Sequence, residues 1–185
     1  MPHLLALAAS FRTGSLNRRL LAVAVNQAKQ AGATVTELDY AACDAPLYHE
    51  ELAGEQLPPG AKTLADALLQ CDGLLLASPE YNWSMPGSLK NLIDWLSIDS
   101  RAPLHGKTAL LMCASPSTRG GITGLLQLRV PLEHLGMWVY PHVVGVGDGE
   151  KNLQTGNLLT PKDESYLNTC VADFVRKTAA VGHVG

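Results

Sequence analysis

Residues 10–17 combine the side-chain types that bind a phosphate group. Ser10, Thr13 and Ser15 supply short hydroxyl donors, and Arg12 supplies a cation. An apolar run precedes the segment and a helical pattern follows it, so its N–H groups lie at a helix N-terminus, which favours an anion. Because the spacing of a P-loop and the G-x-G-x-x-G of a dinucleotide fold are both absent, we expect a terminal phosphate monoester. Taken singly, Ser15 could be a plain N-cap and Arg12 a solvated side chain.

Residues 79–87 form a second polar segment, bracketed by Pro79 and Pro86. Two prolines fix φ and remove two N–H donors, so the segment is stiff. Its remaining N–H groups can point outward at a flat ligand with polar edges, beside the flat side chains of Tyr81 and Asn82. Glu80 is a general acid by type. We expect instead that its backbone matters and that its carboxylate has a structural or intersubunit partner.

Residues 115–121 form a third polar segment, which also opens a helical pattern. Gly120 and Gly121 allow the backbone to approach a ligand closely. Arg119 either receives an anionic substrate, such as the 2′-phosphate of NADPH, or is a solvated side chain. A phosphate at the first segment and a planar group at the other two describe a mononucleotide with a large ring, and FMN fits this description.

The elements that position these segments are apolar runs alternating with helical patterns. We expect strands at residues 3–9, 33–38, 74–78, 107–114 and 137–146, and helices at residues 15–31, 58–71, 88–98, 122–135 and from 160 onward. Continuous apolar strands alternating with helices predict an α/β fold, a parallel sheet covered on both faces. In such a sheet the three polar segments meet at the carboxyl ends of the strands. Pro131 predicts a kink or a new first turn in the fourth helix.

Composition and charge limit the classes of function. The chain has 185 residues, 46% of them hydrophobic and 17% charged, and we expect a single domain over residues 1–185. A net charge of -3 does not indicate the excess of positive charge that binds nucleic acid or a membrane surface. Because no apolar run could span a membrane and no signal-peptide pattern is present, we expect a cytoplasmic protein. The four cysteines have no C-x-x-C spacing, so we expect buried reduced thiols and no metal site.

Two of the polar segments carry a family resemblance. Residues 9–17, ASFRTGSLN, resemble the G-S-x-R-x-x-S-x-N phosphate loop of the NADPH-dependent FMN reductase family, and residues 78–91, SPEYNWSMPGSLKN, resemble its S-P-E-Y-N-x-S-x-P-G-x-L-K-N motif. The family includes bacterial quinone, chromate and azo-dye reductases. The resemblance implies a flavodoxin-like three-layer sandwich with a five-stranded parallel sheet of order 2-1-3-4-5, bound FMN, and a homodimer or homotetramer.

The resemblance also implies which residues meet the cofactor. The expected FMN-binding residues are Ser10, Arg12, Ser15, Leu16, Asn17, Pro79, Glu80, Tyr81, Asn82, Ser84, Ser115, Gly120 and Gly121. No side chain is expected to be catalytic, because FMN carries the chemistry. Tyr48, in a loop that in relatives can approach the flavin of a neighbouring subunit, and Arg119 are the candidate substrate residues. The segment 115–119 departs from the small glycine-bearing loop of the family, which affects the expected substrate more than the cofactor.

The function these observations favour is an FMN-dependent NAD(P)H oxidoreductase with a ping-pong mechanism. NAD(P)H gives a hydride to bound FMN and leaves, and a quinone, azo compound, metal oxyanion or free flavin then takes the electrons. A flavodoxin-like electron carrier without turnover of its own is the alternative, although carriers usually have a more acidic docking surface. A third interpretation is an interaction module that has lost FMN. The choice between NADH and NADPH stays open at this point, as do the physiological acceptor and the choice between dimer and tetramer.

Overall fold

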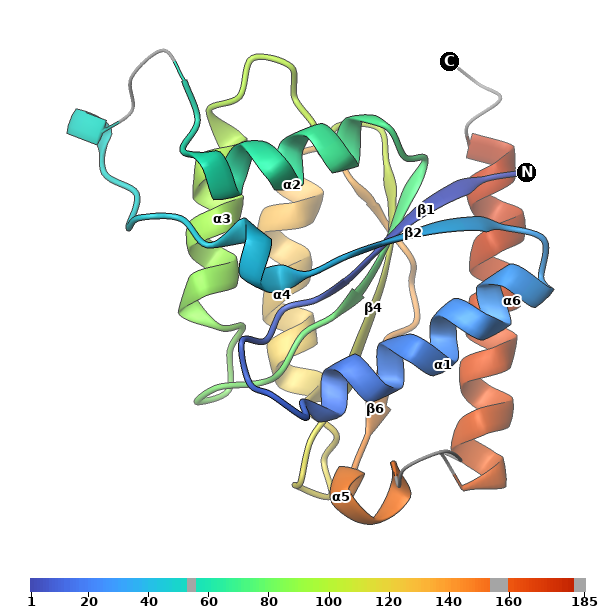
Figure 1. Ribbon diagram of the computed structural model, residues 1–185. Coiled ribbons are helices and arrows are strands. Elements are labelled where there is room, and N and C mark those ends of the chain that lie inside the picture. Colours follow the sequence, from blue (N-terminus) through green and yellow to red (C-terminus); the bar gives the residue numbers. More distant parts are fainter. Residues whose placement is uncertain (53–55, 154–159, 182–185) are drawn as a thin grey trace.

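A parallel sheet forms the centre of the molecule in a computed structural model, which describes residues 1–52, 56–153 and 160–181 (Figure 1). The strand order is β2-β1-β3-β4-β5, and β6 also pairs with β4. The strands are β1 (His3–Ala8), β2 (Thr34–Leu38), β3 (Gly73–Ala77), β4 (Thr108–Ala114), β5 (Trp138–Val139) and β6 (Val144–Val146). The helices are α1 (Leu16–Gln30), α2 (Pro59–Leu69), α3 (Gly87–Ser97), α4 (Ile122–His134), α5 (Gly149–Asn152) and α6 (Pro161–Val181), with two short 3₁₀ turns, η1 (Tyr40–Cys43) and η2 (Glu50–Leu52).

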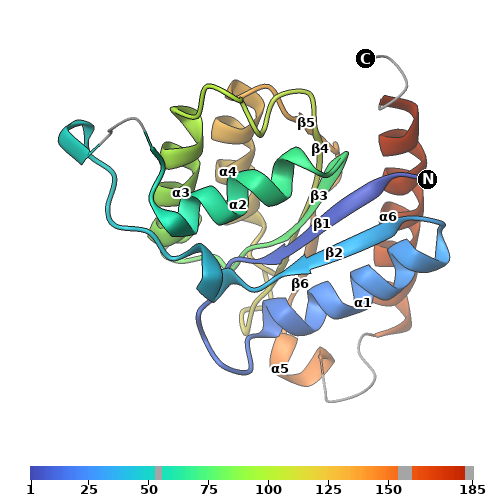
Figure 2. The same ribbon diagram turned by 45° about the horizontal axis from the view of Figure 1, so that its top comes forward.

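Helices cover both faces of the sheet (Figure 2). The helices α1 and α6 lie on one face, and α2, α3 and α4 lie on the other. Successive strand residues point to opposite faces, so Leu4 and Ala6 belong to the core under α1 and α6, whereas Leu5 and Leu7 belong to the other core. Burial on both sides explains why the strands are continuous apolar runs. This order between two helical layers is the predicted flavodoxin-like fold.

The fifth predicted strand is divided into β5 and β6. Both pieces pair with β4, with Val139 opposite Ala109 and Val144 opposite Met112. Between these two pairs the chain advances by five residues from β5 to β6 but by only three along β4. The extra residues are therefore not paired with β4. Pro141 lies in this interval and has no N–H to donate, which is why one continuous strand cannot form here.

The helix ends follow local sequence signals. The Ser15 hydroxyl caps α1 by accepting a bond from the N–H of Asn17, and Pro59 occupies the first turn of α2. The helix α4 passes through Pro131 as one element, so the new first turn that we considered there does not form. All four cysteines are buried free thiols, as predicted.

Candidate functional site

The three polar loops after β1, β3 and β4 border one pocket. In the sheet, β1 lies between β2 and β3, so the order of the strands reverses between β1 and β3, where ligands bind in this type of sheet. Side chains from all three loops line the pocket: Ser10, Arg12, Ser15, Leu16, Asn17, Pro79, Glu80, Tyr81, Ala114, Ser115 and Pro116. Most of the predicted cofactor residues therefore lie together. Asn82, Ser84, Gly120 and Gly121 belong to the same loops but do not line this pocket.

The first loop presents hydrogen-bond donors at the N-terminus of α1. The buried hydroxyl oxygens of Ser10 and Ser15 accept bonds from the N–H groups of Arg12 and Asn17, at 3.3 and 3.2 Å. Each hydroxyl keeps its own proton for a ligand. No acidic residue lies in the first turn of α1, and the Arg12 guanidinium has no hydrogen bond or ion pair with any residue the structure describes. This donor set fits the terminal phosphate of FMN.

Asn17 has a structural role that the sequence analysis missed. Its side-chain amide donates to the carbonyl of Ala114 at 3.1 Å and accepts from the N–H of the same residue at 2.9 Å. Both residues are buried, so the start of α1 is fastened to the end of β4. The amide nitrogen has a second N–H that this bridge does not use, so the contact of Asn17 with the phosphate stays a prediction. A polar residue on the buried face of α1, in line with Leu20 and Ala24, was the available signal.

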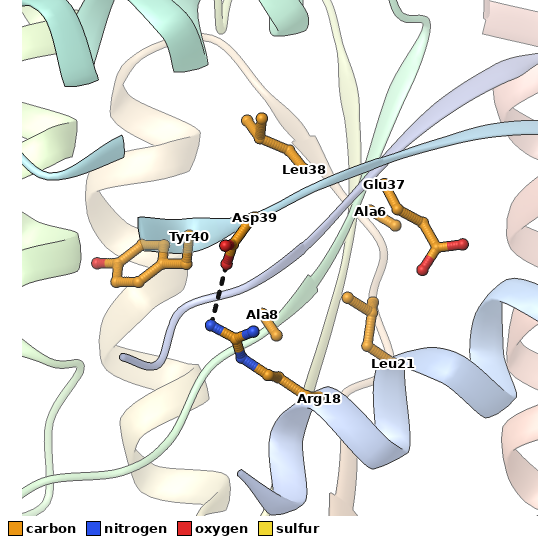
Figure 3. Close-up of a pocket in the computed structure, with 8 residues that line it drawn as sticks. All are labelled: Ala6, Ala8, Arg18, Leu21, Glu37, Leu38, Asp39 and Tyr40. Carbon is orange, nitrogen blue, oxygen red and sulfur yellow. Dashed lines mark hydrogen bonds and ion pairs between the residues drawn. The ribbon is translucent and has the colours of Figure 1, made fainter. Parts of the chain in front are cut away.

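Arg18 also holds the first loop in place. Its guanidinium donates to the carbonyl of Ser10 from Nε and Nη2, at 3.4 and 3.2 Å, and to Asp39 at 3.0 Å. Figure 3 shows this ion pair reaching across a second hollow of about 320 Å³ between α1 and the ends of β1 and β2. The residues around it are Ala6, Ala8, Arg18, Leu21, Glu37, Leu38, Asp39 and Tyr40. The Arg18–Asp39 pair on the wall of this hollow thus supports the first loop.

The second loop contains a tight two-residue turn. The N–H of Tyr81 donates to the carbonyl of Ser84 at 2.9 Å, and the N–H of Ser84 donates back at 3.0 Å. Between them Asn82 and Trp83 have φ values of 50° and 67°, which is the type I′ pattern. We expected the N–H groups of this loop to point outward, and for Tyr81 and Ser84 this is wrong because the turn uses them. The side chains of Tyr81 and Trp83 remain more than half exposed.

The carboxylate of Glu80 reaches the first turn of α4. It accepts a bond from the N–H of Gly124, the third residue of that helix, at 2.6 Å. Gly121 at the N-cap has no side chain that could cap α4, so Glu80 supplies the acceptor from another loop. The predicted structural partner for this carboxylate is confirmed. A side chain at Gly124 would be a tight fit beside it, because an added Cβ would lie 3.1 Å from Glu80 Cγ.

The third loop is packed tightly onto the sheet. Gly121 has a φ of +67°, and an added Cβ would lie 2.3 Å from Cys113 Sγ. We expected Gly120 and Gly121 to allow close approach to a ligand, but the close neighbours of Gly121 are protein atoms. Burial raises the pKa of the Cys113 thiol to about 12, so the thiol is neutral at physiological pH. In the same loop the guanidinium carbon of Arg119 lies 3.9 Å from the centroid of the Trp83 ring.

Tyr48 lies apart from the pocket. Its ring packs edge-on against Trp95 with the ring centroids 5.0 Å apart, and its N–H donates to Asn91 Oδ1 at 2.7 Å. Asn91 and Trp95 also donate to the carbonyl of Pro46, so α3 holds this loop firmly. Within one chain Tyr48 does not join the other predicted residues, and its approach to a neighbouring subunit stays a prediction.

None of the helices in residues 1–52, 56–153 and 160–181 is both long and apolar enough to cross a membrane. The same residues contain no group of three or more His, Cys, Asp or Glu side chains arranged to hold a metal ion.

Comparison with known proteins decides the family. The model of the NADPH-dependent FMN reductase family matches residues 2–151. The chain belongs to this family. The quinone reductase of Escherichia coli is 32% identical over 182 residues, which cover 95% of this chain and 96% of that protein. An NAD(P)H-dependent FMN reductase of Pseudomonas aeruginosa is 34% identical over 131 residues, covering 71% of this chain and 69% of its own length.

The solved structures agree on the fold. FerB, a flavoenzyme NAD(P)H:(acceptor) oxidoreductase from Paracoccus denitrificans, superposes with a TM-score of 0.81 over 97% of this chain and 98% of its own, at 24% identity. The family and its curated members make this reductase an FMN-dependent NAD(P)H oxidoreductase, as the two motifs predicted. They give no support to the alternative of an electron carrier without turnover.

Proposed function

We propose that the three loops hold FMN with its phosphate at the N-terminus of α1, and that the reductase passes electrons from NAD(P)H to quinones. The observation that carries the proposal is the donor set of the first loop, which opens into a pocket walled by the other two loops. The relatives named as quinone reductases support the choice of acceptor.

Each loop has a separate task in this proposal. Ser10, Ser15 and Arg12 bind the phosphate through hydroxyl protons and a cation. Pro79 and Tyr81 border the ring from the second loop, and Ser115 borders it from the third. When bound, FMN supplies two-electron chemistry that no side chain can provide. The protein contributes orientation and donors, and no side chain has to act as an acid or base.

The overall reaction balances without a further reactant. NAD(P)H is oxidised to NAD(P)⁺ and gives up a hydride, which carries two electrons. The quinone gains these two electrons and two protons to become a hydroquinone, with the second proton taken from solvent. The two substrates react in turn at the same site, which gives ping-pong kinetics. Azo compounds and metal oxyanions are acceptors of the same kind.

An absorbance spectrum tests the proposal. We expect the protein, purified or mixed with FMN, to show flavin bands that bleach when NADPH or NADH is added without air and return when a quinone is added. Flavin bands that do not bleach with either nucleotide would contradict the reductase activity. A protein that takes up no FMN would contradict the site itself.

We propose further that the reductase is a homo-oligomer that uses the outer face of α4. Ile122, Leu126 and Val130 recur at every fourth position on this helix and are exposed, although the opposite face of α4 is buried in the core. An apolar stripe of this kind marks an interface more often than a free surface. Sedimentation should give a dimer or tetramer at micromolar concentration, and Leu126→Glu should dissociate it while Gln127→Glu, at an exposed neighbour, should not. A monomeric wild type would contradict the proposal.

We propose the cytoplasm as the compartment, since the electron donor NAD(P)H is found there. Four buried free thiols are consistent with a reducing compartment.

A further inference from the structure

Two exposed side chains from different loops stack on each other beside the pocket. Arg119 belongs to the loop after β4 and Trp83 to the turn after β3, and the guanidinium carbon lies 3.9 Å from the centroid of the indole ring. The ring is 53% exposed, so it is not there to fill the core. Ser115, Pro116 and Tyr81, which line the pocket, come from the same two loops.

The backbone at Trp83 is unfavourable for a tryptophan. With a φ of 67° it occupies the second central position of a type I′ turn, where glycine is preferred and a bulky residue is strained. Glycine would close the same turn without strain. A strained residue kept at an exposed position suggests a function for its side chain, and the contact of this indole ring is with Arg119.

The charge of Arg119 is available to a ligand. Within the described residues its guanidinium has no ion pair and no hydrogen-bond acceptor. The Trp83 ring contacts it through the π face alone, which leaves the N–H donors of the guanidinium unused. The carboxylate of Glu80 on the neighbouring loop is engaged with the N–H of Gly124 at 2.6 Å. The backbone N–H of Arg119 donates to Ser117 Oγ within the same loop at 3.3 Å, so this bond does not use the guanidinium. A guanidinium stacked on an indole ring keeps a fork of N–H donors that suits a sulfonate, carboxylate or phosphate.

We propose that Arg119 and Trp83 form a receiving site for the anionic group of a planar reactant. This inference rests on the proposed function, because the reactant is one that must reach the flavin pocket. The shared chemistry is an anionic oxygen cluster attached to a flat ring system. It can come from the acceptor, as in a sulfonated quinone or azo compound, or from the donor, as the 2′-phosphate that distinguishes NADPH from NADH.

A binding measurement tests the site without turnover. Naphthalene sulfonate, which cannot be reduced, is titrated calorimetrically into FMN-loaded protein. We expect Arg119→Gln to weaken its binding by about tenfold or more, whereas Arg176→Gln, which removes the same charge from the exposed face of α6, leaves it unchanged. Trp83→Gly should also weaken binding without lowering the melting temperature, because glycine suits the turn. Equal affinity of the wild type and Arg119→Gln would overturn the proposal.

Kinetics then identify the source of the anion. If the acceptor supplies it, Arg119→Gln lowers kcat/KM for a naphthoquinone sulfonate and leaves that for unsulfonated naphthoquinone unchanged. If the donor supplies it, the variant loses the preference for NADPH over NADH with the neutral quinone. A variant that changes neither ratio contradicts the inference while leaving the reductase function intact. Failure of the wild type to reduce any quinone would instead contradict the proposed function.

Discussion

Replacing Asn17 by alanine should destabilise the protein strongly, although the residue lies at the edge of the proposed site. The amide of Asn17 is the bridge between α1 and the end of β4, with hydrogen bonds of 3.1 and 2.9 Å to the two polar groups of Ala114. The alanine variant leaves both of these buried groups without their partner. Each of the two unsatisfied buried groups costs about 1–3 kcal/mol, so the free energy of unfolding should fall by about 2–6 kcal/mol. A typical domain has only about 5–15 kcal/mol in total.

Urea denaturation of the FMN-free protein, followed by circular dichroism, measures this loss. With a slope of about 2 kcal/mol per molar, the midpoint should fall by about 1–3 M while the slope stays constant. The matched control is Asn26→Ala on the exposed face of the same helix, which should change the midpoint little. If Asn17→Ala lowered the midpoint no more than the control, the bridge would not contribute as we argue.

Two further predictions concern the buried surroundings of the site. Gly121→Ala should lose at least about 2 kcal/mol of stability, because the residue has a φ of +67° and its added Cβ would clash with Cys113 Sγ. The control Gly32→Ala should lose clearly less, because Gly32 has a φ of +92° but lies in open space, so the variant has backbone strain alone. Equal melting temperatures of the two variants would refute the clash. Burial raises the pKa of Cys43 to about 11 and the pKa values of Cys113 and Tyr40 to about 12, so the folded state retains protons that the unfolded chain releases from about pH 9 upward. Stability should therefore fall as the pH rises from about 9 toward 12, and equal urea midpoints at about pH 8 and about pH 10.5 would contradict this.

The fold was predictable because each strand is apolar on both faces. A run such as Leu74–Ala77 has no place in a solvent-exposed sheet, and the alternation with helical patterns then requires parallel pairing. The break in the last strand was predictable in principle, since Pro141 interrupts its ladder. We missed it because the apolar pattern continues on both sides of the proline.

The members of the site were easier to predict than their tasks. Residue types and loop positions brought Ser10, Ser15 and Tyr81 to one pocket. The task of a polar side chain depends on its partner in space, and the partner of Asn17 is 97 residues away. Glu80 likewise reaches Gly124 in α4, which only the folded chain brings near. Long-range hydrogen bonds of this kind leave no periodic signal in the sequence.

The most direct test of the central claim compares the affinities of FMN and riboflavin, which differ by the phosphate alone. Riboflavin lacks the charge-assisted bonds from Ser10, Arg12 and Ser15, so its affinity should be lower than that of FMN by a factor of about one hundred or more. In Arg12→Ala/Ser15→Ala this preference should shrink to about tenfold or less, while Arg176→Ala should keep it. Equal affinities for FMN and riboflavin in the wild type, or an unchanged preference in the double variant, would contradict a phosphate site at the start of α1.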